Sequence, residues 1–168
     1  TERTEQMVRL ARALLMLIDT DDDAPETLRE ALSDLAVQFG LAPWGVPTLN
    51  RSPHLFERAL MDALADPRGG SIAFNLGALE RAAQALRERL STEQWSVVRS
   101  MGVHVAALRV PHGLPRPAQV LPALDRLGVQ LAAVTGAQTD RMTRDHGWRF
   151  MTVGRLLERL IGMSTQFG

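Results

Sequence analysis

Residues 71–95 have the sequence SIAFNLGALERAAQALRERLSTEQW, and this stretch decides the fold class. Ser71 is a good N-cap residue, and apolar side chains follow it at helical spacing. The inner face of this helix is predicted to hold Ile72, Leu76, Leu79, Ala83, Leu86 and Leu90. Ser91 with Gln94 three residues later has the form of a capping box, so a second helix is predicted to start there, with Trp95, Val98 and Val105 on it.

The same helical spacing extends in both directions from this stretch, without the alternation of β-strands. Before it, we predict a helix that ends at the acidic residues 19–23, a helix over residues 26–39, and a helix from the cap Ser52 to Ala65. After it, we predict a helix over residues 118–135, with Gly136 as its terminator, and a last helix that Thr143 opens. The expected fold is all-α: one domain over residues 1–168, built as a helical bundle of about seven helices.

The composition excludes several classes of function. The 19 basic and 19 acidic side chains cancel, so neither nucleic acid nor a membrane surface is expected as a partner. The chain has no Cys, and all its basic residues are Arg, which excludes thiol catalysis, Schiff-base chemistry and a lysine phosphate loop. The apolar run 13–18 is too short to span a bilayer, so we expect a cytoplasmic protein.

No cofactor or metal is expected. The spacing of Asp19, Asp21, Asp23 and Glu30 resembles a calcium loop, but Ala24 stands where that loop needs Gly. The four histidines do not form the pairs of a di-iron or zinc site. Core or partner-groove packing is the expected role of Trp44, Trp95 and Trp148.

Charged residues are densest near the last predicted helix, and two interpretations stay open. They form either an interhelical ion-pair network around Trp148 or an arginine-lined pocket for a carboxylate or phosphate. The candidate acid–base residues are Asp145, His146 and Glu158, and the candidate anion-binding residues are Arg144, Arg149, Arg155, Arg159, Arg87, Glu2 and Arg3.

A second candidate anion site is the turn formed by Arg68, Gly69, Gly70 and Ser71, where backbone amides and a guanidinium precede a helix. Glycine turns that lead into capped helices are also common without a ligand.

Two Glu-Arg pairs, Glu2-Arg3 and Glu158-Arg159, lie in the first and last predicted helices with similar apolar residues around them. We expect these helices to be neighbours that bring the two pairs close together.

The stretch 136–150, followed by Gly154-Arg155 and Leu156 to Arg159, strongly resembles the Alpha-E family, an all-helical bacterial family defined by a Glu-Arg motif. Residues 71–72 and 87–95 resemble its middle segment, and Glu2-Arg3 with Glu5 and Arg9 its first Glu-Arg helix. The segment before that motif is expected to be missing here.

The resemblance implies partners rather than chemistry, because such domains occur beside or fused to circularly permuted ATP-grasp ligases and transglutaminase-like peptidases. We therefore expect an accessory or binding domain of a system that forms peptide-like amides, which recognises a ligase or an anionic peptide-like substrate through an arginine-rich face. The alternatives are an enzyme that uses Asp145, His146 and Glu158 with an arginine clamp, or a structural module that forms homo-oligomers.

Overall fold

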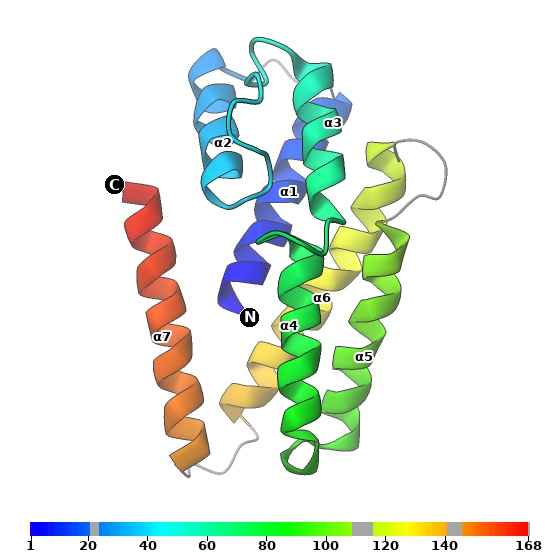
Figure 1. Ribbon diagram of the computed structural model, residues 1–168, viewed down its shortest axis with the longest axis vertical. Coiled ribbons are helices and arrows are strands. Elements are labelled where there is room, and N and C mark those ends of the chain that lie inside the picture. The colour runs from blue at the N-terminus through cyan, green and yellow to red at the C-terminus, as the bar shows by residue number, and fades with distance from the viewer. Residues whose placement is uncertain (21–23, 109–115, 141–145, 168) are drawn as a thin grey trace.

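The computed structural model describes residues 1–20, 24–108, 116–140 and 146–167, and these residues form helices and no strands. The elements are α1 (Glu2–Thr20), α2 (Glu26–Gln38), α3 (Pro53–Leu64), α4 (Ile72–Ala85), the short 3-10 helix η1 (Arg87–Arg89), α5 (Thr92–Ala107), α6 (Pro117–Asp140) and α7 (His146–Phe167). The predicted all-α, single-domain bundle is confirmed (Figure 1).

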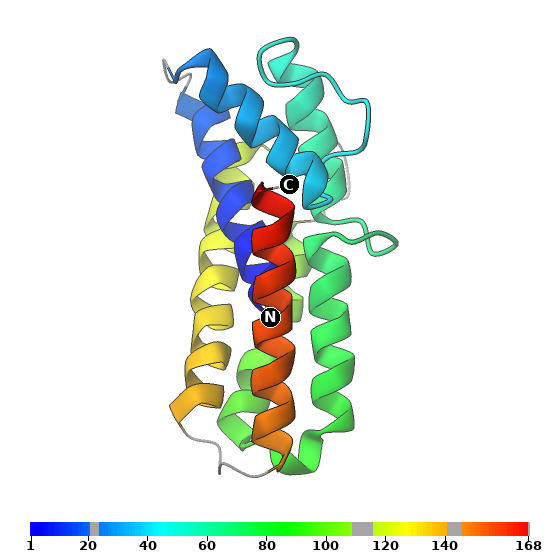
Figure 2. The same ribbon diagram turned by 90° about the vertical axis from the view of Figure 1, so that its left-hand side faces the viewer.

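Helix α1 is the centre of the bundle. It packs most extensively on α6 and also contacts α2, α3, α4 and α7, as Figures 1 and 2 show from two sides. Its side chains Met7, Ala11, Leu14 and Leu15 are fully buried because neighbours cover α1 on several sides. At the solvent-exposed edge of this contact, Arg12 of α1 forms an ion pair with Asp125 of α6.

Helices α4, α5 and α6 are sequential neighbours along the long axis of the bundle (Figure 1). Both predicted caps are confirmed: the Ser71 hydroxyl, just before α4, accepts a hydrogen bond from the Phe74 N–H, and Ser91 and Gln94 form the full capping box at the start of α5. The prediction that Leu86 belongs to the core is wrong. Helix α4 ends at Ala85 and η1 turns the chain, so the Leu86 side chain is exposed.

Gly136 does not terminate α6, which continues to Asp140. A glycine inside a helix costs about 1 kcal/mol relative to alanine, and the helical residues on both sides of Gly136 outweigh that cost. Pro122 also lies inside α6, near its N-terminal end.

The segment between α2 and α3 is irregular but contributes to the core. Gly40 adopts a positive φ of 75°, which lets the N–H groups of Gly40 and Leu41 bond back to the carbonyls of Val37 and Ala36 and close α2. Leu41 and Leu49 of this segment are buried in the core. Trp44 is 94% exposed, so packing in the core is wrong for this residue, and packing in a partner's groove stays a prediction.

Leu28 belongs to the apolar stripe that helical spacing predicts for the helix over residues 26–39, but in α2 its side chain is about half exposed. Among the described helices, none is both long and apolar enough to cross a lipid bilayer.

Candidate functional site

The two Glu-Arg pairs meet where the beginning of α1 faces α7, so the prediction of their proximity is confirmed. The Arg159 guanidinium donates a hydrogen bond of 3.0 Å to the Glu2 carboxylate. In the other direction, the Glu158 carboxylate accepts hydrogen bonds from the backbone nitrogens of Thr1 and Glu2, at 3.2 and 3.1 Å. The pairs are thus exchanged: each glutamate binds a group of the other helix.

Glu158 acts on α1 as a capping residue supplied by another helix. The first N–H groups of a helix have no partner inside the helix and carry partial positive charge, so a carboxylate there is favourable. The Glu158 carboxylate occupies this position, which explains a glutamate on the inner side of α7 without invoking catalysis.

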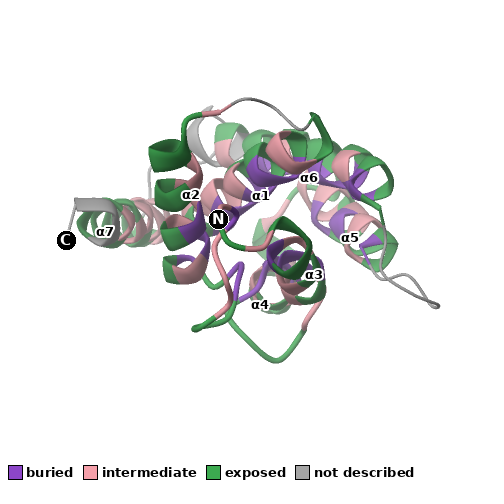
Figure 3. Cartoon of the chain, turned by 90° about the horizontal axis from the view of Figure 1, so that it is seen from above, coloured by how far each residue is buried: buried purple, intermediate pink, exposed green. Residues whose placement is uncertain are grey.

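Helix α7 carries most of its large apolar side chains on the side that faces away from the bundle. The half-buried positions face the bundle and include Trp148, Met151, Arg155 and Glu158, whereas the outward face is largely apolar. Its exposed large side chains are Phe150, Val153, Leu156, Leu157, Leu160, Ile161 and Met163. Figures 1 and 3 show α7 at the edge of the bundle, and its main contacts among the described helices are with α1.

Leu156, Leu157 and Leu160 are therefore exposed on α7 and do not pack in the core. The sequence shows their helical spacing but not which face meets the bundle. The contacts of the Glu-Arg pairs determine that face, since Glu158 must reach the end of α1.

The candidate arginines of α7 do not share one face. Arg149 is exposed on the outer side, next to the apolar face, while Arg155 is half-buried toward the bundle. Six residues of helix place them about 120° apart around the axis. Arg159 is held by Glu2. Arg144 lies outside the described residues.

The candidate acid–base residues are also separated. His146 begins α7 and Glu158 lies twelve residues later, about 18 Å along the helix. The structure therefore does not bring His146 and Glu158 into one site, and Asp145 lies outside the described residues.

Arg87 occupies a corner between α4 and α5. Its guanidinium lies 5.4 Å from the centroid of the Trp95 ring and donates to the Leu90 carbonyl at 3.3 Å. These contacts fix Arg87 as part of that corner.

In the glycine turn before α4, Arg68 donates a hydrogen bond of 3.1 Å to Asp66. This bond and the charge of Asp66 raise the pKa of the Arg68 guanidinium. Ser71 caps α4, and Asn75 binds the Gly70 carbonyl at 3.0 Å. The Arg3 guanidinium lies 3.6 Å from where a Cβ on Gly70 would stand. The sequence does not reveal this neighbour of the turn, because Arg3 comes from α1.

A cleft of about 640 Å³ lies beside this turn, between the end of α2 and α3. Gly69, Gly70 and Ser71 line one side, and the exposed Trp44 and Leu55 line another. Among the described residues, no group of three or more His, Asp or Glu side chains is placed so that it could hold a metal ion.

Comparison with known proteins identifies the family. A family profile described as a predicted alpha-helical domain with a conserved ER motif matches residues 1–167. No curated protein and no solved structure matches the chain. The match covers essentially the whole chain, and the two Glu-Arg pairs that resemble the named motif contact each other in the fold: the chain belongs to the Alpha-E family.

Proposed function

We propose that this chain is an accessory binding domain that docks a protein partner through the outward face of α7 and carries out no chemistry of its own. The observation that carries the proposal is the set of seven large apolar side chains exposed on one helix, from Phe150 to Met163. Soluble proteins expose most of their large apolar side chains singly, and a contiguous group of them on one face marks a site of interaction. The outward face of α7 is such a group, and it fits the apolar centre of a protein interface.

The charges at this face favour a different protein over a second copy of α7. Arg149 is exposed beside the apolar side chains, and the single acidic residue of α7, Glu158, is turned toward α1. A second α7 would therefore offer Arg149 no carboxylate. We expect the partner to present an apolar surface with an acidic edge.

The resemblance to the Alpha-E family supplies the expected partner, an ATP-grasp ligase in a bacterial, cytoplasmic system that forms peptide-like amides. A transglutaminase-like peptidase is the second expected partner. Because this chain has neither Lys nor Cys, the nucleotide-binding lysine or the peptidase thiol would belong to the partner.

The test is direct binding between this chain and a circularly permuted ATP-grasp ligase of the kind that occurs beside Alpha-E domains, measured by biolayer interferometry with the ligase immobilised. Leu157→Asn and Arg149→Ala should each weaken binding about tenfold or more, since they change the centre and the edge of the proposed interface. Val129→Asn is the matched control, because Val129 is an exposed apolar residue on α6. It should leave the affinity unchanged.

The absence of a complex, or equal losses for Leu157→Asn and Val129→Asn, would contradict the proposal. Size-exclusion chromatography of the chain alone distinguishes the structural alternative. A dimer that Leu157→Asn dissociates would mean that α7 pairs two copies, and the proposed partner docking would be wrong.

A further inference from the structure

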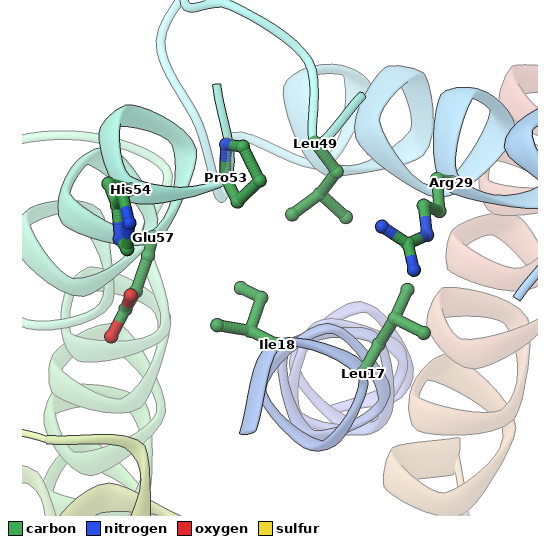
Figure 4. A pocket seen from close by; sticks show the side chains of 7 residues that line it. All are labelled: Leu17, Ile18, Arg29, Leu49, Pro53, His54 and Glu57. Carbon is green, nitrogen blue, oxygen red and sulfur yellow. The ribbon is translucent and has the colours of Figure 1, made fainter. Parts of the chain in front are cut away.

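A cavity of about 360 Å³ lies at the other end of the molecule from the start of α7, between the end of α1, α2 and α3. Figure 4 shows its lining: Leu17 and Ile18 of α1 on one side, Leu49 opposite them, and polar side chains at two further sides. Its volume is within the range of small-molecule sites, about 300–1,000 Å³.

The walls of the cavity are preformed by a buried hydrogen-bond chain. The Ser33 hydroxyl, in α2, donates to the Arg29 carbonyl at 2.7 Å and accepts from the Leu49 N–H at 3.1 Å. Ser33 is 1% exposed and Leu49 is 3% exposed. These two hydrogen bonds of Ser33 hold the loop before α3 against α2. A ligand would therefore not have to order that wall of the cavity when it binds.

The two polar sides of the cavity carry opposite charges. Arg29 extends from α2 into the space from one side, whereas Glu57 and His54 of α3 stand on the other side in Figure 4. The Glu57 side chain is half-buried and has no hydrogen bond or ion pair within the described chain. The Arg29 guanidinium has five N–H donors, so it can bind a carboxylate in addition to the contact that it already makes.

We propose that this cavity binds a small zwitterion with separated charges, a free dipeptide, with its carboxylate at Arg29 and its ammonium group at Glu57. The apolar surface of Leu17, Ile18 and Leu49 would receive an aliphatic side chain. A cube of the cavity's volume has an edge of about 7 Å, the length of about two extended residues.

One guanidinium facing one carboxylate selects a ligand of zero net charge with a positive and a negative end. A nucleotide or an inorganic anion would leave Glu57 against negative charge, and a cation would face Arg29. This inference does not rest on docking at α7, because the cavity is formed by α1, α2 and α3.

The experiment is a titration of the ¹⁵N-labelled full chain with leucyl-leucine, followed by ¹H–¹⁵N NMR. Shift changes that saturate and centre on Leu17, Leu49 and Glu57 are expected. The N-acetylated and C-amidated forms of the dipeptide should each bind about tenfold more weakly, because each lacks one charge.

Two variants assign the ends of the ligand. Glu57→Gln should bind leucyl-leucine and its N-acetylated form equally, and Arg29→Gln should bind leucyl-leucine and its C-amidated form equally. Asp62→Asn and Arg58→Gln are the matched controls, because these α3 residues line the cleft near Trp44 instead. They should retain the full preference for the free dipeptide.

Absence of saturating shifts, shifts centred elsewhere, or equal binding of the blocked dipeptides to the unmodified chain would overturn the proposal. The comparison of blocked ligands needs no variant, so it decides the question even if a substitution at Arg29 unfolds the chain. The two proposals can fail separately. If the chain binds the ligase but not the dipeptide, only this inference is wrong, and if it binds the dipeptide but not the ligase, only the proposed function is wrong.

Discussion

Helices α1 and α7 carry the same Glu-Arg motif and similar apolar spacing, yet the bundle uses them in opposite ways. In α1, Met7 and Leu14 are fully buried, whereas in α7 Phe150 is 77% exposed and Leu157 is 54% exposed. Both helices use the motif for the same contact, since Glu2 binds Arg159 and Glu158 binds the beginning of α1.

The comparison shows that the Glu-Arg motif determines which sides of α1 and α7 face each other. It does not determine how far either helix is buried. Neighbours on several sides cover α1, while α1 is the main neighbour of α7. The motif side chains occupy the side of α7 that faces α1, so the apolar residues on its other side remain outside. The predictions below test this division, from the largest expected effect to the smallest.

The largest loss of stability is expected for a substitution in α1. Leu14→Ala removes a fully buried side chain at the centre of the bundle and should lower the free energy of unfolding by about 2–5 kcal/mol. Urea denaturation followed by circular dichroism measures this loss. A loss under about 1 kcal/mol would mean that α1 is not the packing centre.

A smaller effect is expected where Glu158 caps α1. Glu158→Ala leaves the Glu2 N–H without its acceptor and should cost about 1 kcal/mol, because the position is partly exposed to solvent. Glu158→Gln keeps an acceptor oxygen and should lose less. If both variants unfold at the wild-type urea concentration, the carboxylate does not cap α1.

A weaker interaction still is expected between Glu2 and Arg159. A double-mutant cycle with Glu2→Gln and Arg159→Met should give a coupling energy of about 0.2–1 kcal/mol, as is usual for exposed ion pairs. The coupling should fall in 1 M NaCl, where the charges are screened. A coupling that salt does not change would indicate packing instead of charge.

The helices and most of their ends could be predicted from the sequence because their signals are local. The caps at Ser71 and at Ser91 with Gln94 depend on side chains within three residues of the helix start. Gly136 shows the limit of such signals, since a glycine marks a helix end only where the chain turns, and in α6 the helical residues around it continue the helix.

The meeting of the two Glu-Arg pairs was predictable from their repetition, but the surroundings of the other candidate residues were not. Arg3 comes beside Gly70, and Arg29 faces the cavity across from Glu57, through contacts between distant parts of the chain. Similarly, the sequence predicts an arginine-rich face near the last helix but not which arginines share it. Their true division between an inner and an outer side depends on where α1 lies.

The smallest effect on stability is expected at Leu157, and it is the sharpest contrast with Leu14 because both substitutions remove the same atoms. Leu157→Ala on the outward face of α7 should change the free energy of unfolding by less than about 0.5 kcal/mol, since the side chain is already 54% exposed and alanine favours the helix. The urea midpoint measures it, in parallel with Leu14→Ala. A loss of 2 kcal/mol or more, comparable to a core position, would mean that the chain buries this face in solution. The comparison between α1 and α7 would then describe two buried helices, and the docking surface proposed for α7 would already be occupied.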